Sequence, residues 1–310
     1  MPGKGDLLSR HPKREDGGVT FEAAMGQTLS GISVGMVLFL IAAGLSIIFG
    51  TLKVLNLAHG SIYMVGGFLC YGLTTTLATI PGSFWWALLL APILVALLGG
   101  FLEIFLLRRI YAQDMLYQYI LTFGLILILG ETCKFIWGVG YNTVPVPWPV
   151  DGKVSILGLM FPVYNLFLIG CGIAVFVGLL ALMRFTELGR MIRAVTYNRE
   201  MANALGINVP RVYTGVFMLG CYLAGLAGAL MPPMSVVALG ADMSVIIDCF
   251  IIVVIGGLGS LPGAFLGATI LGLMNAFGIY IIPKLAVAFA FMLMIVILII
   301  RPWGLMGKPE

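Results

Sequence analysis

Residues 187–212 read ELGRMIRAVTYNREMANALGINVPRV, a polar run in the middle of an otherwise apolar chain. The whole chain is 61% hydrophobic, whereas this run holds four arginines and two glutamates, namely Arg190, Arg193, Arg199, Arg211, Glu187 and Glu200. Charged side chains at this density are too costly to place in hydrocarbon, so they must lie in water. The run therefore predicts a solvent-exposed loop between apolar segments.

Local signals within the run predict a short helix. Asn198 can accept a backbone N–H bond as an N-cap, and Gly206 permits the left-handed conformation that ends a helix. Pro210 blocks any continuation. A helix of about two turns is unstable alone in water, so it needs a packing partner. Three apolar side chains are available for that contact, Met201, Ala204 and Leu205. Two interpretations fit, an ordinary basic connecting loop and a docking element for a cytosolic partner.

The composition is that of a polytopic membrane protein. The mean hydropathy is +1.09 and charged residues make up 10% of the chain, against about 25% in a soluble domain. The 41 glycines suit close packing between membrane helices. The net charge of +4 lies in loops, so it indicates membrane orientation and no nucleic-acid partner is expected. The cysteines form no CxxC pair and are expected to be buried thiols: Cys70, Cys133, Cys171, Cys221 and Cys249.

Nine apolar segments approach the length of about 20 residues that a membrane span needs: 30–50, 61–80, 85–107, 117–137, 162–183, 213–231, 244–257, 261–282 and 285–300. Basic residues near 108, in the 187–212 run and near 301 assign these loops to the cytoplasm. Both ends of the chain carry basic residues, so we expect both termini there. Nine full crossings of the membrane would place the two termini on opposite sides of it. We therefore expect an all-α, polytopic transmembrane protein of about eight spans, with one broken or re-entrant N-terminal segment.

Two polar interruptions mark the apolar sequence. Residues 51–60, TLKVLNLAHG, place Lys53, Asn56 and His59 inside an apolar run, and residues 255–263, IGGLGSLPG, break a second run with glycines and a proline. Paired interruptions in two halves of a transporter point to a substrate path near the bilayer midplane. The alternative is two packing kinks beside glycine-rich interfaces.

Ionisable residues within the apolar segments are candidates for function. His59 could line a pathway or could satisfy backbone carbonyls that the break releases. Asp248 lies inside the seventh apolar segment with no basic neighbour in sequence, so it needs a partner, a proton or water. Asp242 is expected in the outer loop, in contact with solvent.

No catalytic constellation is present. The chain has two histidines, no GxSxG elbow and no HExxH motif, so neither nucleophilic nor metal chemistry is indicated. It also lacks GxxxxGK[ST], so it has no P-loop with which to bind ATP. We expect a protein that is not an enzyme, with no cofactor of its own.

Three segments resemble the permease subunits of branched-chain amino acid ABC transporters. These are NLAHGSIYMVGGF at 56–68, GRMIRAVTYNREMANALGINVPRV at 189–212 and VIGGLGSLPGAFLGA at 254–268. The similarity runs from about residue 29 to the closing RPWGLMGKPE and leaves the N-terminal tail uncovered. The segments occur in the family's order, which makes the match specific.

The resemblance implies a multi-pass permease of the bacterial plasma (inner) membrane, surrounded by lipid. Its partners would be two cytosolic ABC ATPases that bind the ATP, a second homologous permease or a second copy of itself, and a periplasmic or extracellular solute-binding protein. The loop that couples to the ATPases falls on Gly189, Arg190, Arg193, Ala194, Asn198, Ala202, Gly206 and Ile207. The candidates for the translocation path are Asn56, His59, Gly60, Ser61, Asp248, Gly256, Gly257, Gly259 and Ser260.

One position departs from the family pattern. Many relatives carry a lysine about eight residues ahead of the GGLGS motif, where this chain has Asp248. The added anion disfavours an anionic solute and leaves several classes open, namely branched-chain amino acids, urea, short amides and organic acids. A stand-alone secondary transporter or channel, with Asp248 or His59 as a proton or ion site, is the alternative function.

These expectations divide the chain into three parts. Residues 1–28 would form a flexible cytoplasmic tail and residues 29–303 the transmembrane permease domain, with the coupling loop at 184–212. Residues 304–310 would form a cytoplasmic C-terminal tail.

Overall fold

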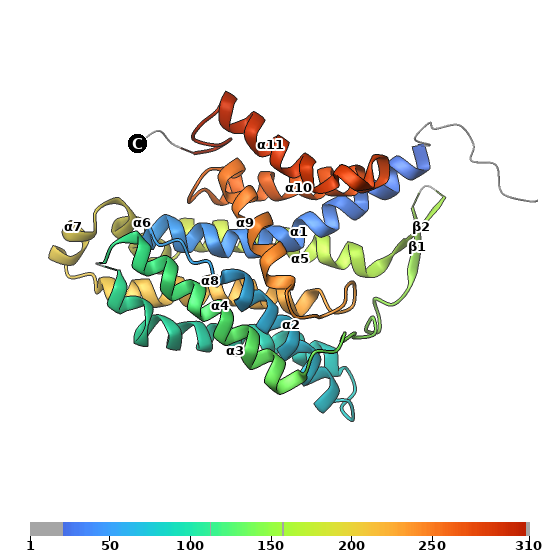
Figure 1. Ribbon diagram of the computed structural model, residues 1–310, viewed down its shortest axis with the longest axis horizontal. Coiled ribbons are helices and arrows are strands. Elements are labelled where there is room, and N and C mark those ends of the chain that lie inside the picture. Colours follow the sequence, from blue (N-terminus) through green and yellow to red (C-terminus); the bar gives the residue numbers. More distant parts are fainter. Residues whose placement is uncertain (1–20, 112, 157, 308–310) are drawn as a thin grey trace, which may run out of the picture.

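The computed structural model describes residues 21–111, 113–156 and 158–307, which form an elongated bundle of helices (Figure 1). The elements in chain order are α1 (Phe21–Leu52), α2 (His59–Thr76), α3 (Ser83–Phe105), η1 (Leu107–Ile110), α4 (Met115–Trp137), β1 (Lys153–Ile156), β2 (Leu159–Pro162), α5 (Val163–Phe185), α6 (Glu187–Tyr197), α7 (Arg199–Ala204), α8 (Val209–Leu230), α9 (Ala241–Gly256), α10 (Leu261–Ile281), η2 (Pro283–Leu285) and α11 (Ala286–Ile300).

Each of the nine predicted apolar segments forms a helix, which confirms the all-α, polytopic prediction. By length and composition, six helical stretches in the described part can cross a membrane: Glu22–Leu52, Ser83–Ile110, Met115–Trp137, Val163–Phe185, Val209–Leu230 and Leu261–Ile281. The remaining three, α2, α9 and α11, are shorter, at 18, 16 and 15 residues.

Helix α1 lies at the centre of the bundle, with 83% of its membrane-length window buried. It packs closely on α10 through glycines. A Cβ atom built on Gly35 would lie 2.8 Å from the carbonyl oxygen of Ala268, and one on Gly272 would lie 2.3 Å from that of Gly31. Small residues therefore let the two backbones touch, which is how membrane helices associate without a hydrophobic drive.

Aromatic rings add a second layer of packing around α1. Phe39 of α1 meets Phe176 of α5 and Phe265 of α10 with ring centroids 5.7 and 5.2 Å apart, and the last two rings stack at 4.3 Å. These edge-on and stacked contacts fix α5 and α10 against the central helix.

The outward faces of α3, α4 and α5 are apolar and uncovered. Their exposed side chains include Leu97, Phe101, Leu116, Ile120, Phe123, Ile128, Phe135 and Val177. Exposed apolar side chains in this number suit lipid or a second membrane subunit.

A hairpin of β1 and β2 closes one end of the bundle, and α6 and α7 lie at the other end (Figure 1). The antiparallel register pairs Lys153 with Pro162 and Ile156 with Leu159. This hairpin within the outer loop was not predicted. Arg190, Arg193, Arg199 and Arg211 all belong to the α6–α7 end of the chain, so the positive-inside rule assigns that end to the cytoplasm and the hairpin end to the outside.

The two described ends of the chain lie at opposite ends of the bundle. Helix α1 contacts β2 near its start and α6 near its end, where Thr196 and Thr51 hydroxyls are 3.5 Å apart. The C-terminal segment lies at the α6 end (Figure 1). The positive-inside rule, applied to the loops, would place the start of α1 outside, whereas the basic residues at 1–20 led us to expect a cytoplasmic N-terminus. Those residues lie outside the described part, so that expectation stays a prediction.

The predicted tails are also shorter than expected. Residues 21–28 are helical, since α1 begins at Phe21. At the other end, the backbone N–H groups of Leu305 and Met306 donate to the carbonyl oxygens of Ile255 and Gly256 at 2.8 and 3.1 Å. Residues 304–307 are thus attached to α9, and residues 308–310 lie outside the described part.

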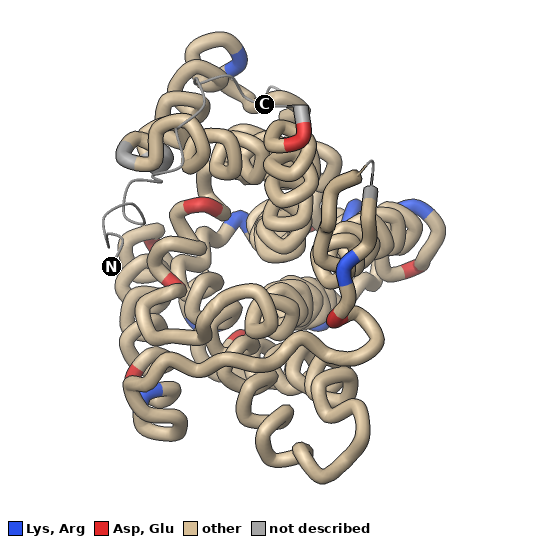
Figure 2. The backbone as a smooth tube through the Cα atoms, turned by 90° about the vertical axis from the view of Figure 1, so that its right-hand side faces the viewer, with Lys and Arg blue, Asp and Glu red and all other residues tan. Residues whose placement is uncertain are grey.

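Figure 2 looks onto the hairpin end and shows how few charged residues the bundle carries. Two ion pairs join residues that are close in sequence. Arg108 meets Glu103 at 3.0 Å, and Lys134 meets Glu131 at 3.1 Å.

Candidate functional site

The 187–212 run folds into two short helices, each started by a side-chain cap. The Gly189 N–H donates to the Thr186 hydroxyl at 3.1 Å to begin α6, and the Met201 N–H donates to Oδ1 of Asn198 at 2.9 Å to begin α7. Gly206, at φ 85°, then turns the chain into α8. The predicted cap at Asn198 and stop at Gly206 are confirmed. Pro210, however, lies in the first turn of α8, where proline favours a helix start.

One face of this pair of helices is anchored to the bundle. Gly189, Ile192 and Val195 of α6 and Ala202 of α7 are buried. A Cβ atom on Gly189 would lie 2.3 Å from the carbonyl oxygen of Leu182, so α6 folds directly back on the end of α5. Gly189 and Ala202, both predicted coupling residues, therefore hold the loop in place against the bundle.

The opposite face is uncovered. Tyr197, Leu205 and Met201 are 94%, 74% and 59% exposed. Arg193 is exposed and forms no hydrogen bond or ion pair within the described part, while Arg190 pairs only with exposed Glu187, at 3.3 Å. Ala194 and Ile207 are half-buried between the two faces. An anchored element with uncovered apolar and basic side chains is suited to binding another protein.

The first interruption is a non-helical segment over 53–58, as predicted. Asn56 is buried, and its Oδ1 accepts the N–H of Ala58 at 3.1 Å. His59 is also fully buried, with Nε2 3.1 Å from the carbonyl oxygen of Ile41 on α1. This carbonyl lies within α1 and is not one that the break releases, so both roles considered for His59 stay predictions.

The segment ends against the start of α9. The Ser61 hydroxyl donates to Oδ2 of Asp242 at 2.7 Å, and Asp242 is only 6% exposed. A Cβ atom on Gly60 would lie 2.4 Å from the carbonyl oxygen of Asp242. The prediction of a solvated Asp242 is therefore wrong, because the close approach of α2 buries the first turn of α9.

The second interruption lies at the other end of α9. Gly257 and Gly259 have φ values of 98° and 80°, and Ser260 caps α10 by accepting the N–H of Gly263 at 3.1 Å. Gly256 packs against Gly263, where an added Cβ would lie 2.3 Å from the carbonyl carbon. These residues make a tight turn and a helix cap.

The two interruptions do not form one cluster. Gly50, just before the first interruption, lies close to the second, since a Cβ on it would lie 3.0 Å from Cα of Gly259. Residues 53–58 then run the length of α9, whose 16 residues span about 24 Å. His59, Gly60 and Ser61 thus lie at the start of α9, whereas Gly257, Gly259 and Ser260 follow its end, and their common role in a path stays a prediction.

Asp248, in contrast, lines a cavity of about 610 Å³ between α1, α9, α10 and α11. The described lining residues are Gln27, Ser30, Val34, Ser244, Ile247, Asp248, Ile251, Gly272, Asn275, Ala276, Ile279, Ala290 and Phe291. Of the predicted path residues, Asp248 alone is among them. Gln27 and Asn275 were missed, although an amide within an apolar helix is a signal that sequence reading can find.

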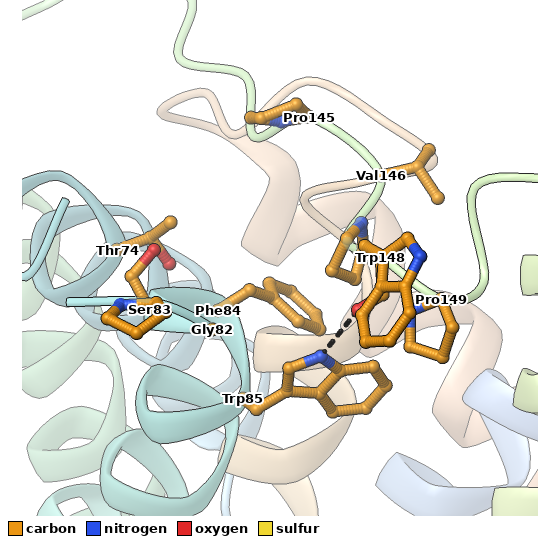
Figure 3. A pocket seen from close by; sticks show the side chains of 11 residues that line it. Thr74, Gly82, Ser83, Phe84, Trp85, Pro145, Val146, Trp148 and Pro149 are labelled. Carbon is orange, nitrogen blue, oxygen red and sulfur yellow. Dashed lines mark hydrogen bonds between the residues drawn. The ribbon is translucent and has the colours of Figure 1, made fainter. Parts of the chain in front are cut away.

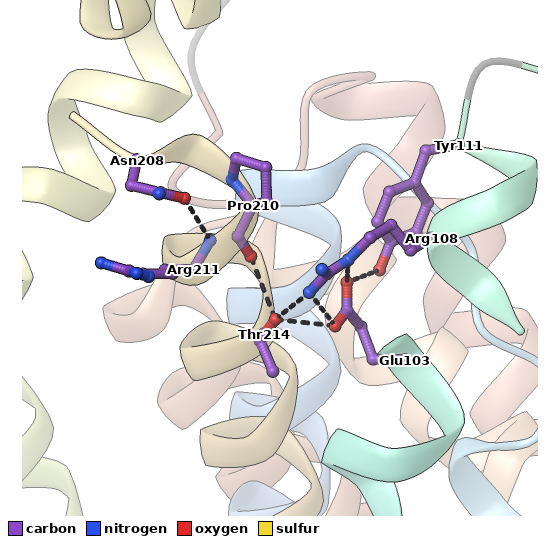
Figure 4. A network of polar contacts seen from close by, with 7 residues as sticks. All are labelled: Glu103, Arg108, Tyr111, Asn208, Pro210, Arg211 and Thr214. Carbon is purple, nitrogen blue, oxygen red and sulfur yellow. Dashed lines mark hydrogen bonds and ion pairs between the residues drawn. The ribbon is translucent and has the colours of Figure 1, made fainter. Parts of the chain in front are cut away.

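A buried polar network joins the inner ends of α3 and α8 (Figure 4). Glu103 is 0% exposed, and its carboxylate accepts from Arg108 at 3.0 Å, from Tyr111 at 3.2 Å and from Thr214 at 2.7 Å. Arg108 also donates to Thr214. Burial, with the adjacent Glu103 carboxylate, raises the pKa of Tyr111, which keeps its hydroxyl a donor. Thr214 lies one turn after the α7–α8 connection, so the network supports the base of the exposed loop.

A second cavity, of about 480 Å³, opens at the hairpin end (Figure 3). Trp85 closes one side by donating from Nε1 to the carbonyl oxygen of Trp148 at 2.9 Å. The prolines Pro145, Pro147 and Pro149 also line the cavity, and the Trp148 side chain is 80% exposed. This rigid aromatic and proline surface faces away from α6 and α7.

The sequence of the chain is similar to those of known transport proteins. The family model described as "Branched-chain amino acid transport system / permease component" matches residues 27–298. The high-affinity branched-chain amino acid transport system permease protein BraD of Pseudomonas aeruginosa is 29% identical over 294 residues, which cover 92% of this chain and 96% of BraD. The corresponding LivH protein of Escherichia coli is 27% identical over 304 residues, with coverage of 92% and 96%.

A more distant relative is the probable branched-chain amino acid transport permease protein LivH of Methanocaldococcus jannaschii. It is 26% identical over 284 residues, which cover 87% of this chain and 88% of the relative. No solved structure matches the chain.

Proposed function

Because the chain belongs to the family of permease components of branched-chain amino acid transport systems, we propose that it is the membrane-spanning subunit of a binding-protein-dependent ABC importer for branched-chain amino acids or a similar small polar solute. It is a multi-pass protein of the inner membrane and not an enzyme. ATP is bound by partner ATPases, in keeping with the lack of a P-loop in this chain.

One observation carries this proposal, the α6–α7 element with its anchored inner face and uncovered outer face. Ile192, Val195 and Ala202 fix the element to the bundle, while Tyr197 and Leu205 stay exposed. A groove in a cytosolic ATPase would cover those side chains and the adjacent Arg193. Closure of two ATPases on ATP would then move α6 and α7, and through them the attached helices, as a rigid-body switch of access.

Further partners follow from the surfaces. A second homologous permease, or a second copy of this chain, would cover part of the apolar face of α3, α4 and α5. An external solute-binding protein would dock on the hairpin end, where Trp148 and the neighbouring prolines form a rigid surface. An assembly with a pair of permeases would bind two ATPases.

Co-purification tests the assignment. The tagged chain is extracted gently from its native membrane, and the proteins that accompany it are identified by mass spectrometry. We expect a P-loop ATPase, reduced at least about tenfold by Leu205→Asp or Arg193→Glu, since a buried unpaired charge in an interface costs several kcal/mol. The matched control is Val139→Asp, which places the same charge at a residue 75% exposed near the hairpin end.

The alternative function makes an opposite prediction. A stand-alone secondary transporter would be recovered without an ATPase and would take up solute in proteoliposomes that contain only this chain. It would also tolerate both loop substitutions. That combination would replace the importer assignment.

A further inference from the structure

The cavity beside Asp248 brings several polar side chains together within a mostly apolar lining. Gln27 lies six residues after the start of α1 at Phe21, about 9 Å along the helix. Ser244 and Asp248 belong to the first half of α9, and Asn275 to the last two turns of α10. Gln27 and Asn275 therefore lie in the outer half of the bundle, and Ser244 and Asp248 of α9 line the same cavity. Such groups face water, a partner or a solute rather than lipid.

The polar groups of this cavity are not satisfied within the described chain. The carboxylate of Asp248 makes no hydrogen bond or ion pair there, and neither do the side-chain amides of Gln27 and Asn275. The Ser244 hydroxyl donates back to the carbonyl oxygen of Ala241 at 3.0 Å, which leaves its lone pairs open to a further donor. Half-buried polar groups without partners destabilise a protein unless something else binds them.

The lining residues also indicate which kind of solute the cavity would bind. Asp248 is the one charged residue among the described lining residues, and α1, α10 and α11 contribute no lysine or arginine to that set. A carboxylate without a fixed cation favours a mobile cation. The amides of Gln27 and Asn275 can donate to a carboxylate, and Ile247, Ile279 and Phe291 supply an apolar wall.

We infer that this cavity is a solute site in the outer half of the permease, which binds the ammonium group of a small solute at Asp248 and its hydrocarbon portion against α10 and α11. The inference rests on the proposed function and narrows it. Solutes that carry an ammonium group, zwitterions included, are accepted, whereas purely anionic organic acids are rejected. Urea is neutral and has no ammonium group that could bind to the Asp248 carboxylate.

A labelling experiment tests the site without requiring transport. Ser244→Cys places a thiol one helical turn before Asp248, about 6 Å away on the same face of α9. In whole cells, the thiol is treated from outside with a cationic or an anionic methanethiosulfonate reagent, which forms a mixed disulfide and releases sulfinate. The chain with its native cysteines alone gives the background, and no native cysteine is among the described lining residues.

We expect the cationic reagent to react faster than the anionic one, and Asp248→Asn to lower this ratio at least about tenfold. L-Leucine and 3-methylbutylamine, which both carry an ammonium group, should slow the labelling. 4-Methylpentanoate, which has the carbon skeleton and carboxylate of leucine without the amine, should not. An absence of labelling from outside, a ratio unchanged by Asp248→Asn, or equal protection by 4-methylpentanoate would each overturn the assignment.

The outcome separates the site from the transporter class. Charge-selective labelling with amine protection, in a chain that recovers no ATPase, would support the cavity while removing the importer assignment. Recovery of the ATPase, with labelling rates that do not depend on Asp248, would overturn the solute site. The importer assignment would still stand.

Discussion

The Glu103 network predicts an unequal response to the loss of its two charges. Glu103 is completely buried, whereas the side chain of Arg108 is 37% exposed. Removal of Arg108 strands a carboxylate that cannot reach water. Removal of the carboxylate leaves a guanidinium that can turn toward solvent. The two halves of one ion pair should therefore contribute differently to stability.

The magnitudes follow from the contacts. Arg108→Met should lower the free energy of unfolding by about 3 kcal/mol, the lower part of the range for a stranded buried charge. Glu103→Gln should lower it by about 1 kcal/mol, since Oε1 of the glutamine can still accept from one of the two hydroxyls, Thr214 or Tyr111, and its Nε2 can donate to the oxygen of the other. The double variant should be more stable than Arg108→Met alone, because it no longer buries an unpaired charge.

Unfolding of the purified chain by SDS in mixed detergent micelles measures these differences. Lys134→Met is the matched control, because its ion pair with Glu131 is exposed at 48% and 73% and should contribute less than about 1 kcal/mol. A larger effect of Glu103→Gln than of Arg108→Met, or a double variant less stable than both, would show that burial of the carboxylate does not govern the network.

Three further substitutions test the contacts of α2, α7 and α9. Gly60→Val should destabilise the chain by about 2 kcal/mol through a clash with the carbonyl of Asp242, whereas Gly124→Val, with open space around it, should be nearly neutral in the same SDS unfolding assay. Ser61→Ala should cost about 1–3 kcal/mol by removing the hydroxyl that donates to buried Asp242, and an unchanged unfolding midpoint would contradict this. Gly206→Ala should cost about 1 kcal/mol through its positive φ, and faster proteolysis between α7 and α8 would report the loosened turn.

Sequence reading succeeded where a physical signal is local. Length and hydropathy located the nine apolar helices, and the cap at Asn198 and the turn at Gly206 were predicted from residues that act within a few positions. The same reasoning failed for Asp242. Its burial depends on Ser61, far away in sequence, and on the close approach that Gly60 permits. No local pattern carries that information.

The candidate path residues also differ in whether the sequence alone could predict them. Asp248 was found because a carboxylate in an apolar segment is conspicuous, but its neighbours Gln27 and Asn275 come from helices that only the fold brings together. The glycine-rich motifs were expected to mark the path itself. In the structure they form turns and helix caps, because glycine serves close packing as readily as it serves a ligand.

The C-terminal segment gives a last test, because it completes the end of α9. The final carbonyl groups of a helix have no partner within it, and those of Ile255 and Gly256 accept from the N–H groups of Leu305 and Met306. Leu305→Pro removes one donor and should cost about 1–3 kcal/mol, while Leu305→Val keeps it and should cost less than about 1.5 kcal/mol. Equal SDS unfolding midpoints for the two variants would mean that side-chain packing, and not the backbone pairing, attaches this segment to α9.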